Sequence, residues 1–99
     1  MAQDEALKIA RIYAESVRAI MAPKAIFLYG SHAKGTATEN SDIDIAVVVD
    51  SIDTDYLSTV AKLWGLTRSV NDDIEPVLLI ESESDNGFLQ TVRQTGIAV

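Results

Sequence analysis

One stretch of the chain, residues 29–49 (YGSHAKGTATENSDIDIAVVV), constrains the fold more than any other. It places a glycine-serine pair, Gly30 and Ser31, between two apolar runs, and the second run opens with Asp42 and Asp44. Side chains alternate between the two faces of a β-strand, so a strand that begins here carries both aspartates on one face at its entrance. Carboxylates this close repel each other, and a divalent cation offsets the repulsion. The stretch therefore predicts a cation site at the start of a strand.

The glycine-serine pair predicts a turn that can hold phosphate. Gly30 permits a tight turn and a close approach of a ligand to the backbone. Residues 31–34 can form a first helical turn, whose free backbone N–H groups favour phosphate, and the Ser31 hydroxyl adds a donor. Each piece alone is better explained as an ordinary turn or strand entrance, because glycine and aspartate are common turn residues. Their order between two apolar runs favours a site for a metal-bound nucleoside triphosphate.

The order Gly-Ser, then Gly, then Ser-Asp-x-Asp followed by aliphatic residues resembles the signature of the polymerase-beta-type nucleotidyltransferases. The short length makes the chain similar to the minimal nucleotidyltransferases of prokaryotes. In that family the turn holds the triphosphate, two aspartates hold magnesium, and a carboxylate on a later strand completes the site. The resemblance implies one or two Mg²⁺ ions at Asp42 and Asp44, and ATP or another nucleoside triphosphate as substrate. It implies nucleotide-binding roles for five residues: Gly30, Ser31, Lys34, Gly35 and Ser41.

A later apolar strand over residues 74–80 offers the third carboxylate. Glu75 lies at the start of this strand, where the family usually has an aspartate, and we take it as the third catalytic and metal-binding residue. Asp73 is the second choice and Asp72 the third. The alternative reading is that Glu75 simply fills an exposed edge. Pro76 predicts an edge strand or a bulge, because proline cannot donate to the hydrogen-bond ladder.

The resemblance also implies a reaction and a partner. Minimal nucleotidyltransferases often pair with a separate helical protein of the HEPN type, and such pairs can act as toxin and antitoxin, with AMP attached to the toxin. The implied function is metal-dependent transfer of a nucleoside monophosphate, AMP from ATP, to a hydroxyl acceptor. Two alternatives stay open: an inactive module of the same fold that binds a partner or senses nucleotide, and an enzyme with a small-molecule acceptor of the aminoglycoside type. A homo-oligomer also stays open.

Composition narrows the class of protein. The formal net charge of −7 argues against generic nucleic-acid binding, which relies on lysine and arginine, while bound metal ions would still permit nucleotide binding. There are no cysteines, which excludes disulfides and cysteine-bound zinc. No secretory signal is visible, and no apolar stretch reaches the ~18 residues of a membrane span. A cytoplasmic protein with no membrane partner is expected.

The remaining pattern predicts an α+β fold, a small mixed β-sheet packed by helices in nucleotidyltransferase-like α-β-α-β-α-β-α order, as a single domain over residues 1–99. Hydrophobic periodicity and turn residues give the other elements. These are helices at 4–21, 55–70 and 85–95 and strands at 24–29, 42–49 and 74–80. Asp4 is expected to cap the first helix, and Asp53 or Thr54 the second. Residues 97–99 are left open as a short strand, a core contact or a docking segment.

Several side chains carry expectations about burial. Ile20 is expected in the apolar stripe of the first helix. Phe88 is expected to point inward, and His32 to be a surface or supporting residue rather than a metal ligand. The buried side of the helix at 55–70 is expected to consist of Leu57, Val60, Ala61, Leu63 and Trp64.

Overall fold

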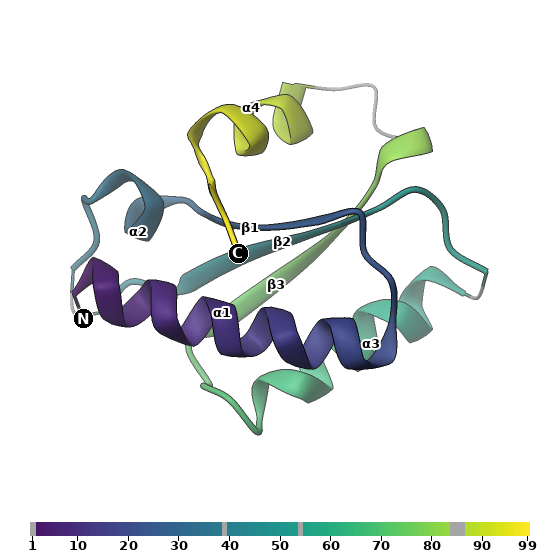
Figure 1. Cartoon of the computed structure of the whole chain (residues 1–99), viewed down its shortest axis with the longest axis horizontal. Coiled ribbons are helices and arrows are strands. Elements are labelled where there is room, and N and C mark those ends of the chain that lie inside the picture. The colour runs from purple at the N-terminus through teal and green to yellow at the C-terminus, as the bar shows by residue number, and fades with distance from the viewer. Residues whose placement is uncertain (1, 39, 54, 84–86) are drawn as a thin grey trace.

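The computed structural model describes residues 2–38, 40–53, 55–83 and 87–99. Helices and strands alternate along the chain around one four-stranded sheet (Figure 1). The expected helix at 85–95 begins at Gly87, since Asp85 and Asn86 lie outside the described residues. In chain order the elements are α1 (Gln3–Ile20), β1 (Ala25–Tyr29), α2 (Ser31–Lys34), β2 (Ile43–Val49), α3 (Tyr56–Thr67), β3 (Ile74–Ile80), the 3-10 helix η1 (Glu81–Glu83), α4 (Gly87–Thr95) and β4 (Ile97–Ala98).

The sheet has the strand order β3-β2-β1-β4 and mixed strand directions, which confirms the predicted α+β class. β2 runs antiparallel to β1 and parallel to β3, and β4 pairs antiparallel with β1. Parallel strands need a crossover connection, which α3 supplies. β3 lies at an edge of the sheet, as Pro76 predicted. The Tyr56 hydroxyl donates to the Leu78 carbonyl oxygen of this edge strand at 3.5 Å.

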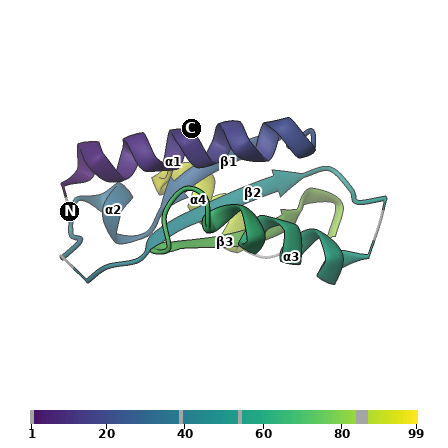
Figure 2. The same cartoon turned by 90° about the horizontal axis from the view of Figure 1, so that it is seen from below.

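The core lies between the sheet and two helices. α1 and α3 cover one face of the sheet, and α4 lies over the other (Figures 1 and 2). The Tyr13 hydroxyl of α1 donates to the Leu63 carbonyl oxygen of α3 at 2.7 Å, and burial raises the pKa of this phenol, which keeps it a neutral donor. Alternate strand residues supply the sheet side of this core: Ile26, Leu28, Ile43, Ile45, Val47, Ile74 and Leu78.

α1 begins and ends one residue earlier than predicted. The N-cap position belongs to Ala2, so the prediction that Asp4 caps the helix is wrong. Asp4 and Glu5 lie in the first turn instead, where the helix dipole favours negative charge. Ile20 is half-exposed at the end of α1 and lines a cavity described below, so its expected burial is also wrong. Within the part of the chain that is described, no helix is both long and apolar enough to cross a membrane.

α3 turns a different face to the sheet than its hydrophobic pattern predicted. Thr59, Leu63 and Thr67 are its buried residues. The threonines tolerate burial because their hydroxyls donate to carbonyls of the same helix or its cap, at 3.3 Å for Thr59 and 2.7 Å for Thr67. The rotation leaves Leu57 71% exposed and Trp64 44% exposed. The predicted burial is therefore wrong for Leu57, Ala61 and Trp64.

The cap of α3 is Asp55, whose carboxylate accepts the Ser58 backbone N–H at 3.2 Å. The prediction of Asp53 as the cap is therefore wrong, and the alternative Thr54 lies outside the described residues. On α4, Leu89 is buried as expected, but Phe88 is 41% exposed and does not point fully inward.

Candidate active site

The strand register places three side chains in one row across the sheet. Asp44 of β2 pairs with Tyr29 of β1 on one side and with Glu75 of β3 on the other. Ile43 and Ile45 belong to the core under α1 and α3, so alternation turns Asp44 to the opposite face, the one on which α4 lies (Figure 1). The row lies at the end of the sheet next to α2, where β1 ends and β2 and β3 begin.

The carboxylates of this row influence one another. Burial raises the pKa of Asp44, the Asp42 charge raises it further, and His32 and a hydrogen bond from Glu75 act in the opposite direction. The pKa of Glu75 is also raised, mainly by the charge of Asp42, then by desolvation and by Asp44. Hydrogen bonding to the two aspartates also favours the protonated form of Glu75, whose single O–H can donate to either of them. Asp42, Asp44 and Glu75 thus form one electrostatic unit, as expected for residues that share a cation.

Glu75→Gln should stabilise the protein in the absence of metal at neutral pH. A pKa raised by folding means that the folded state binds more protons than the unfolded state, so stability falls as pH rises above the ordinary glutamate range. Removing the repelled charge should raise the thermal midpoint at pH 7 by about 2–5 °C. The gain should vanish below about pH 4, where the glutamate is neutral in both states.

The control for this measurement is Glu15→Gln, which removes one charge from the exposed side of α1 and reports the effect of net charge alone. Thermal unfolding of both variants at several pH values, with a chelator present, gives the comparison. A midpoint for Glu75→Gln that is equal to or below that of Glu15→Gln at pH 7 would contradict the proposed repulsion.

The glycine turn lies directly against Asp44. Gly30 has φ 75° and ψ −151°, and a Cβ atom there would collide with the Asp44 carboxylate. This position therefore needs glycine both for its backbone conformation and for its close approach to the carboxylate. Gly35 ends α2 in the left-handed conformation with φ 76°, and its N–H donates to the Ser31 carbonyl. The predicted glycine turn and the predicted acidic pair therefore meet at Gly30 and Asp44.

The loop from α2 to β2 is held by Ser41. Its hydroxyl oxygen accepts the Thr38 backbone N–H at 2.9 Å, and its own N–H donates to the Thr38 carbonyl at 3.1 Å. Ser41 therefore bonds to backbone just before the entrance of β2. Lys34 is exposed at the end of α2.

His32 is a buried residue of α2 that supports the following loop. It is 1% exposed, and its Nε2 lies 3.4 Å from the Ser41 carbonyl oxygen. A carbonyl only accepts, so Nε2 is the donor of this contact, and Nδ1 has no hydrogen-bond partner among the described residues. The Gln3 side chain donates to the His32 carbonyl at 2.9 Å and to the Ala33 carbonyl at 3.2 Å. α1, α2 and the start of β2 are thereby linked.

His32→Asn should destabilise the protein more than His32→Gln. The amide nitrogen of glutamine extends about as far as Nε2 and can still donate to Ser41, whereas that of asparagine is shorter and leaves the buried carbonyl unpaired. The free energy of unfolding should fall by about 1–3 kcal/mol in the asparagine variant and by less in the glutamine variant. Urea unfolding measures both, and equal losses would show that the Nε2 contact contributes nothing.

The three candidates for the third carboxylate differ in position. Glu75 shares the row of Asp44 and interacts with both aspartates. Asp72 and Asp73 are exposed in the turn before β3, where the Asp73 carbonyl accepts the Ile43 N–H at 2.8 Å. Among the described residues no group of three or more histidine, cysteine, aspartate or glutamate side chains is preformed for a metal ion. Magnesium commonly takes one or two carboxylates together with substrate phosphates, so such a site fits assembly with nucleotide.

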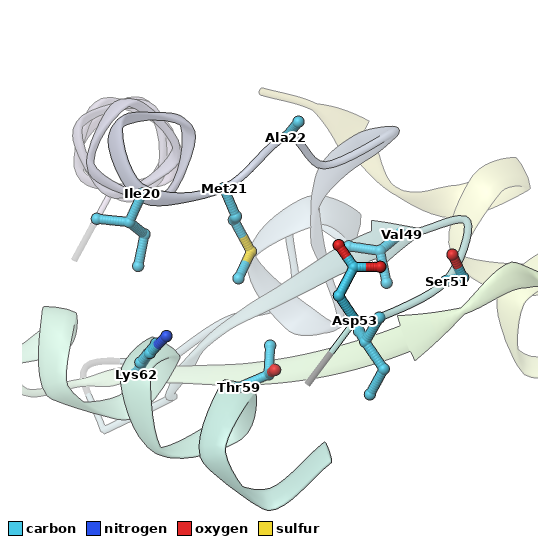
Figure 3. A pocket seen from close by; sticks show the side chains of 9 residues that line it. Ile20, Met21, Ala22, Val49, Ser51, Asp53, Thr59 and Lys62 are labelled. Atoms are coloured by element: carbon cyan, nitrogen blue, oxygen red, sulfur yellow. The ribbon is translucent and has the colours of Figure 1, made fainter. Parts of the chain in front are cut away.

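A cavity of about 350 Å³ lies at the other end of β2 (Figure 3). It contains none of the predicted site residues. The residues that line it come from the end of α1, the end of β2 with its following loop, and α3: Ile20, Met21, Ala22, Val49, Ser51, Ile52, Asp53, Thr59 and Lys62. The carboxylate row at the entrance of β2 remains the candidate site.

Two residues of the site were missed by sequence reasoning. Tyr29 lies opposite Asp44, and burial, then the charges of Asp44 and Glu75, raise the pKa of its phenol. Phe88 of α4 contacts the Tyr29 ring. The position of Tyr29 directly before Gly30 was a usable signal, because the turn places the end of its strand at the site. No sequence signal connects Phe88 to it.

The chain is similar to known nucleotidyltransferases. Residues 8–99 match the family described as "Polymerase beta, Nucleotidyltransferase". A Methanocaldococcus jannaschii protein provisionally named a protein adenylyltransferase is 56% identical over 75 residues, which cover 74% of each chain.

Two solved structures share the fold. One is a crystal structure provisionally described as a nucleotidyltransferase from Sulfolobus solfataricus, with a TM-score of 0.68, 22% identity, and coverage of 97% of this chain and 80% of that one. The other is a toxin-antitoxin complex with AMP-PNP, with a TM-score of 0.60, 25% identity, and coverage of 99% and 72%. With the match along residues 8–99, the chain belongs to the polymerase beta nucleotidyltransferase family.

Proposed function

We propose that this protein transfers AMP from ATP to a hydroxyl group of a partner protein, in a reaction that depends on Mg²⁺. The observation that carries the proposal is the contact between the Gly30 turn and a row of mutually repelling carboxylates, Asp42, Asp44 and Glu75. Hard carboxylate oxygens are the donors that magnesium prefers. Burial first and the charge of Asp42 second raise the pKa of Asp44, and the charge of Asp42 is the main cause of the raised pKa of Glu75; a divalent cation would relieve this repulsion.

In the proposed mechanism the protein supplies alignment and charge placement. Asp42 and Asp44 would hold the metal, with Glu75 sharing it, and the bound ion would neutralise charge on the triphosphate and the leaving group. The backbone around Gly30 and Ser31 would position the outer phosphates. The acceptor hydroxyl oxygen forms a bond to the α-phosphorus, the bond from that phosphorus to the bridging oxygen of the β-phosphate breaks, and pyrophosphate leaves.

Glu75 is the proposed acceptor of the hydroxyl proton. A carboxylate can serve as a general base when it lies within hydrogen-bond reach of the attacking hydroxyl, and Glu75 lies directly beside Asp44 in the strand register. Either a partner residue or solvent would then receive the proton when the next nucleotide binds.

The proposed acceptor is a toxin of the HEPN type, with this chain as the antitoxin. Two relatives support the proposal by their names: a protein adenylyltransferase and a toxin-antitoxin complex with AMP-PNP. We place the reaction in the cytoplasm, as the lack of cysteine suggests.

The first experiment is calorimetric titration with α,β-methylene-ATP, in which the bond that transfer would break is replaced. The wild type should bind in the presence of Mg²⁺ and fail to bind with chelator. The double variant Asp42→Asn, Asp44→Asn should not bind under either condition. Metal-independent binding, or full binding by the double variant, would overturn the assignment of the carboxylates.

A second candidate function is a partner-binding module that no longer transfers nucleotide. The glutamate at position 75, where the family usually has an aspartate, favours it. Co-expression with the candidate partner distinguishes the two, since a transferase adds the mass of AMP to the partner. Complex formation that persists without any mass increase, and also in the double variant, would support the binding module.

A further inference from the structure

An aromatic pair adjoins the carboxylate row on the α4 side of the sheet. The rings of Tyr29 and Phe88 meet edge to face, with centroids 5.6 Å apart and planes at 83°. Tyr29 is the β1 neighbour of Asp44 in the register, and the charges of Asp44 and Glu75 act on its hydroxyl. The pair therefore fixes the start of α4 beside the candidate site.

Phe88 differs from the other large apolar side chains of α4 because it is exposed. Leu89 and Val92 are buried, whereas Phe88 is 41% exposed although it has Tyr29 as a packing partner. The next row of the same face, behind Asp44 and Glu75, contains Ala46 and the half-buried Val77. An accessible aromatic ring and an apolar strand surface thus border a strongly polar site. This combination is typical of pockets for ligands with one charged end and one flat apolar end.

We propose that Phe88, supported by Tyr29, is the stacking surface for the nucleobase. The inference rests on the proposed function and adds the base-binding subsite to it. If the phosphates lie at Gly30 and the metal at Asp44, the base must lie within one nucleotide length of both, on the face to which Asp44 projects. α4 lies over that face (Figure 1), and Phe88 is its exposed aromatic residue. Aromatic stacking favours the large ring system of a purine and tolerates either purine.

Inorganic tripolyphosphate separates base binding from phosphate binding. It presents the phosphates and the metal without a base, so its affinity should not depend on Phe88. We compare Mg²⁺-dependent binding of tripolyphosphate and α,β-methylene-ATP by calorimetry, for the wild type, Phe88→Ala and Phe88→Trp. Phe88→Ala should weaken nucleotide binding about ten- to a hundredfold and leave tripolyphosphate binding unchanged, and Phe88→Trp should retain nucleotide affinity.

The matched control is Trp64→Ala, since Trp64 is an aromatic side chain of similar exposure on α3, across the sheet. It should change neither affinity. Thermal midpoints of all variants verify folding. Wild-type nucleotide affinity in Phe88→Ala, or an equal loss of tripolyphosphate binding, would overturn the base subsite alone. Failure of the wild type to bind both ligands with Mg²⁺ would overturn the proposed function and this inference with it.

Discussion

Asp44→Asn should reduce AMP transfer by about a thousandfold or more, because metal stabilisation of charge in the transition state is worth several kcal/mol. Asp44 is the central member of the carboxylate row and the residue that contacts the Gly30 turn. The fold should survive, since asparagine has nearly the same shape and the change removes a partly buried charge whose pKa is raised by desolvation. Transfer of radiolabelled AMP to the co-expressed partner measures the effect.

Asp50→Asn is the matched control for this change. Asp50 follows the same strand at its other end and makes an exposed ion pair with Lys24 at 3.4 Å, a type of contact that contributes little to stability. The control should keep wild-type transfer. Full transfer by Asp44→Asn would remove Asp44 from the proposed metal site, whatever the control shows.

Gly30→Ala should produce the largest loss of stability among the site variants. The backbone conformation at φ 75° and ψ −151° is essentially restricted to glycine, and the added methyl group would displace the Asp44 carboxylate. Together these effects should lower the free energy of unfolding by about 3 kcal/mol and the thermal midpoint by on the order of 15 °C. Mg²⁺-dependent nucleotide binding should be lost as well, because the turn would move.

Gly35→Ala is the comparison variant, with a milder backbone strain and no contact with Asp44. Gly35 has φ 76° and ψ 17°, the ordinary left-handed region, and a Cβ atom there meets no described atom within 4 Å. Its substitution should cost only the backbone strain of about 1–2 kcal/mol. Differential scanning calorimetry compares the thermal midpoints of the two variants. Equal midpoints would show that the contact between Gly30 and Asp44 does not contribute to stability.

The strands, the turn and the acidic pair of the site followed from the sequence, because each depends on local chemistry. Asp42 directly precedes β2 and Asp44 is the second residue of this strand, so the two carboxylates lie close together at the strand entrance whatever the rest of the chain does. Pro76 restricts β3 to an edge because it lacks an N–H, and the sheet order confirms this. Glu75 could be proposed as the third carboxylate from the family resemblance, although its role is still a prediction.

The face of α3 and the surroundings of the site were decided by tertiary structure. Hydrophobicity predicted that Trp64 and Leu57 are buried, but packing places Thr59 and Thr67 on the buried side, and their hydroxyls tolerate this because they bond within the helix or to its cap. A lone histidine in a polar loop gave no sign of burial. His32 is buried because the loop folds back and brings Ser41 to its ring.

By itself, the sequence determined which residues are the candidates for binding phosphate and metal, because residue type and spacing along a strand or turn set that chemistry. Only the tertiary structure determined that Gly30 contacts Asp44, that Glu75 stands in the same row, and that Tyr29 and Phe88 border the site. The physical reason is that strand register and helix placement arise from packing between segments far apart in the chain. A local sequence pattern does not specify which side chains of a distant strand or helix will lie next to a given residue.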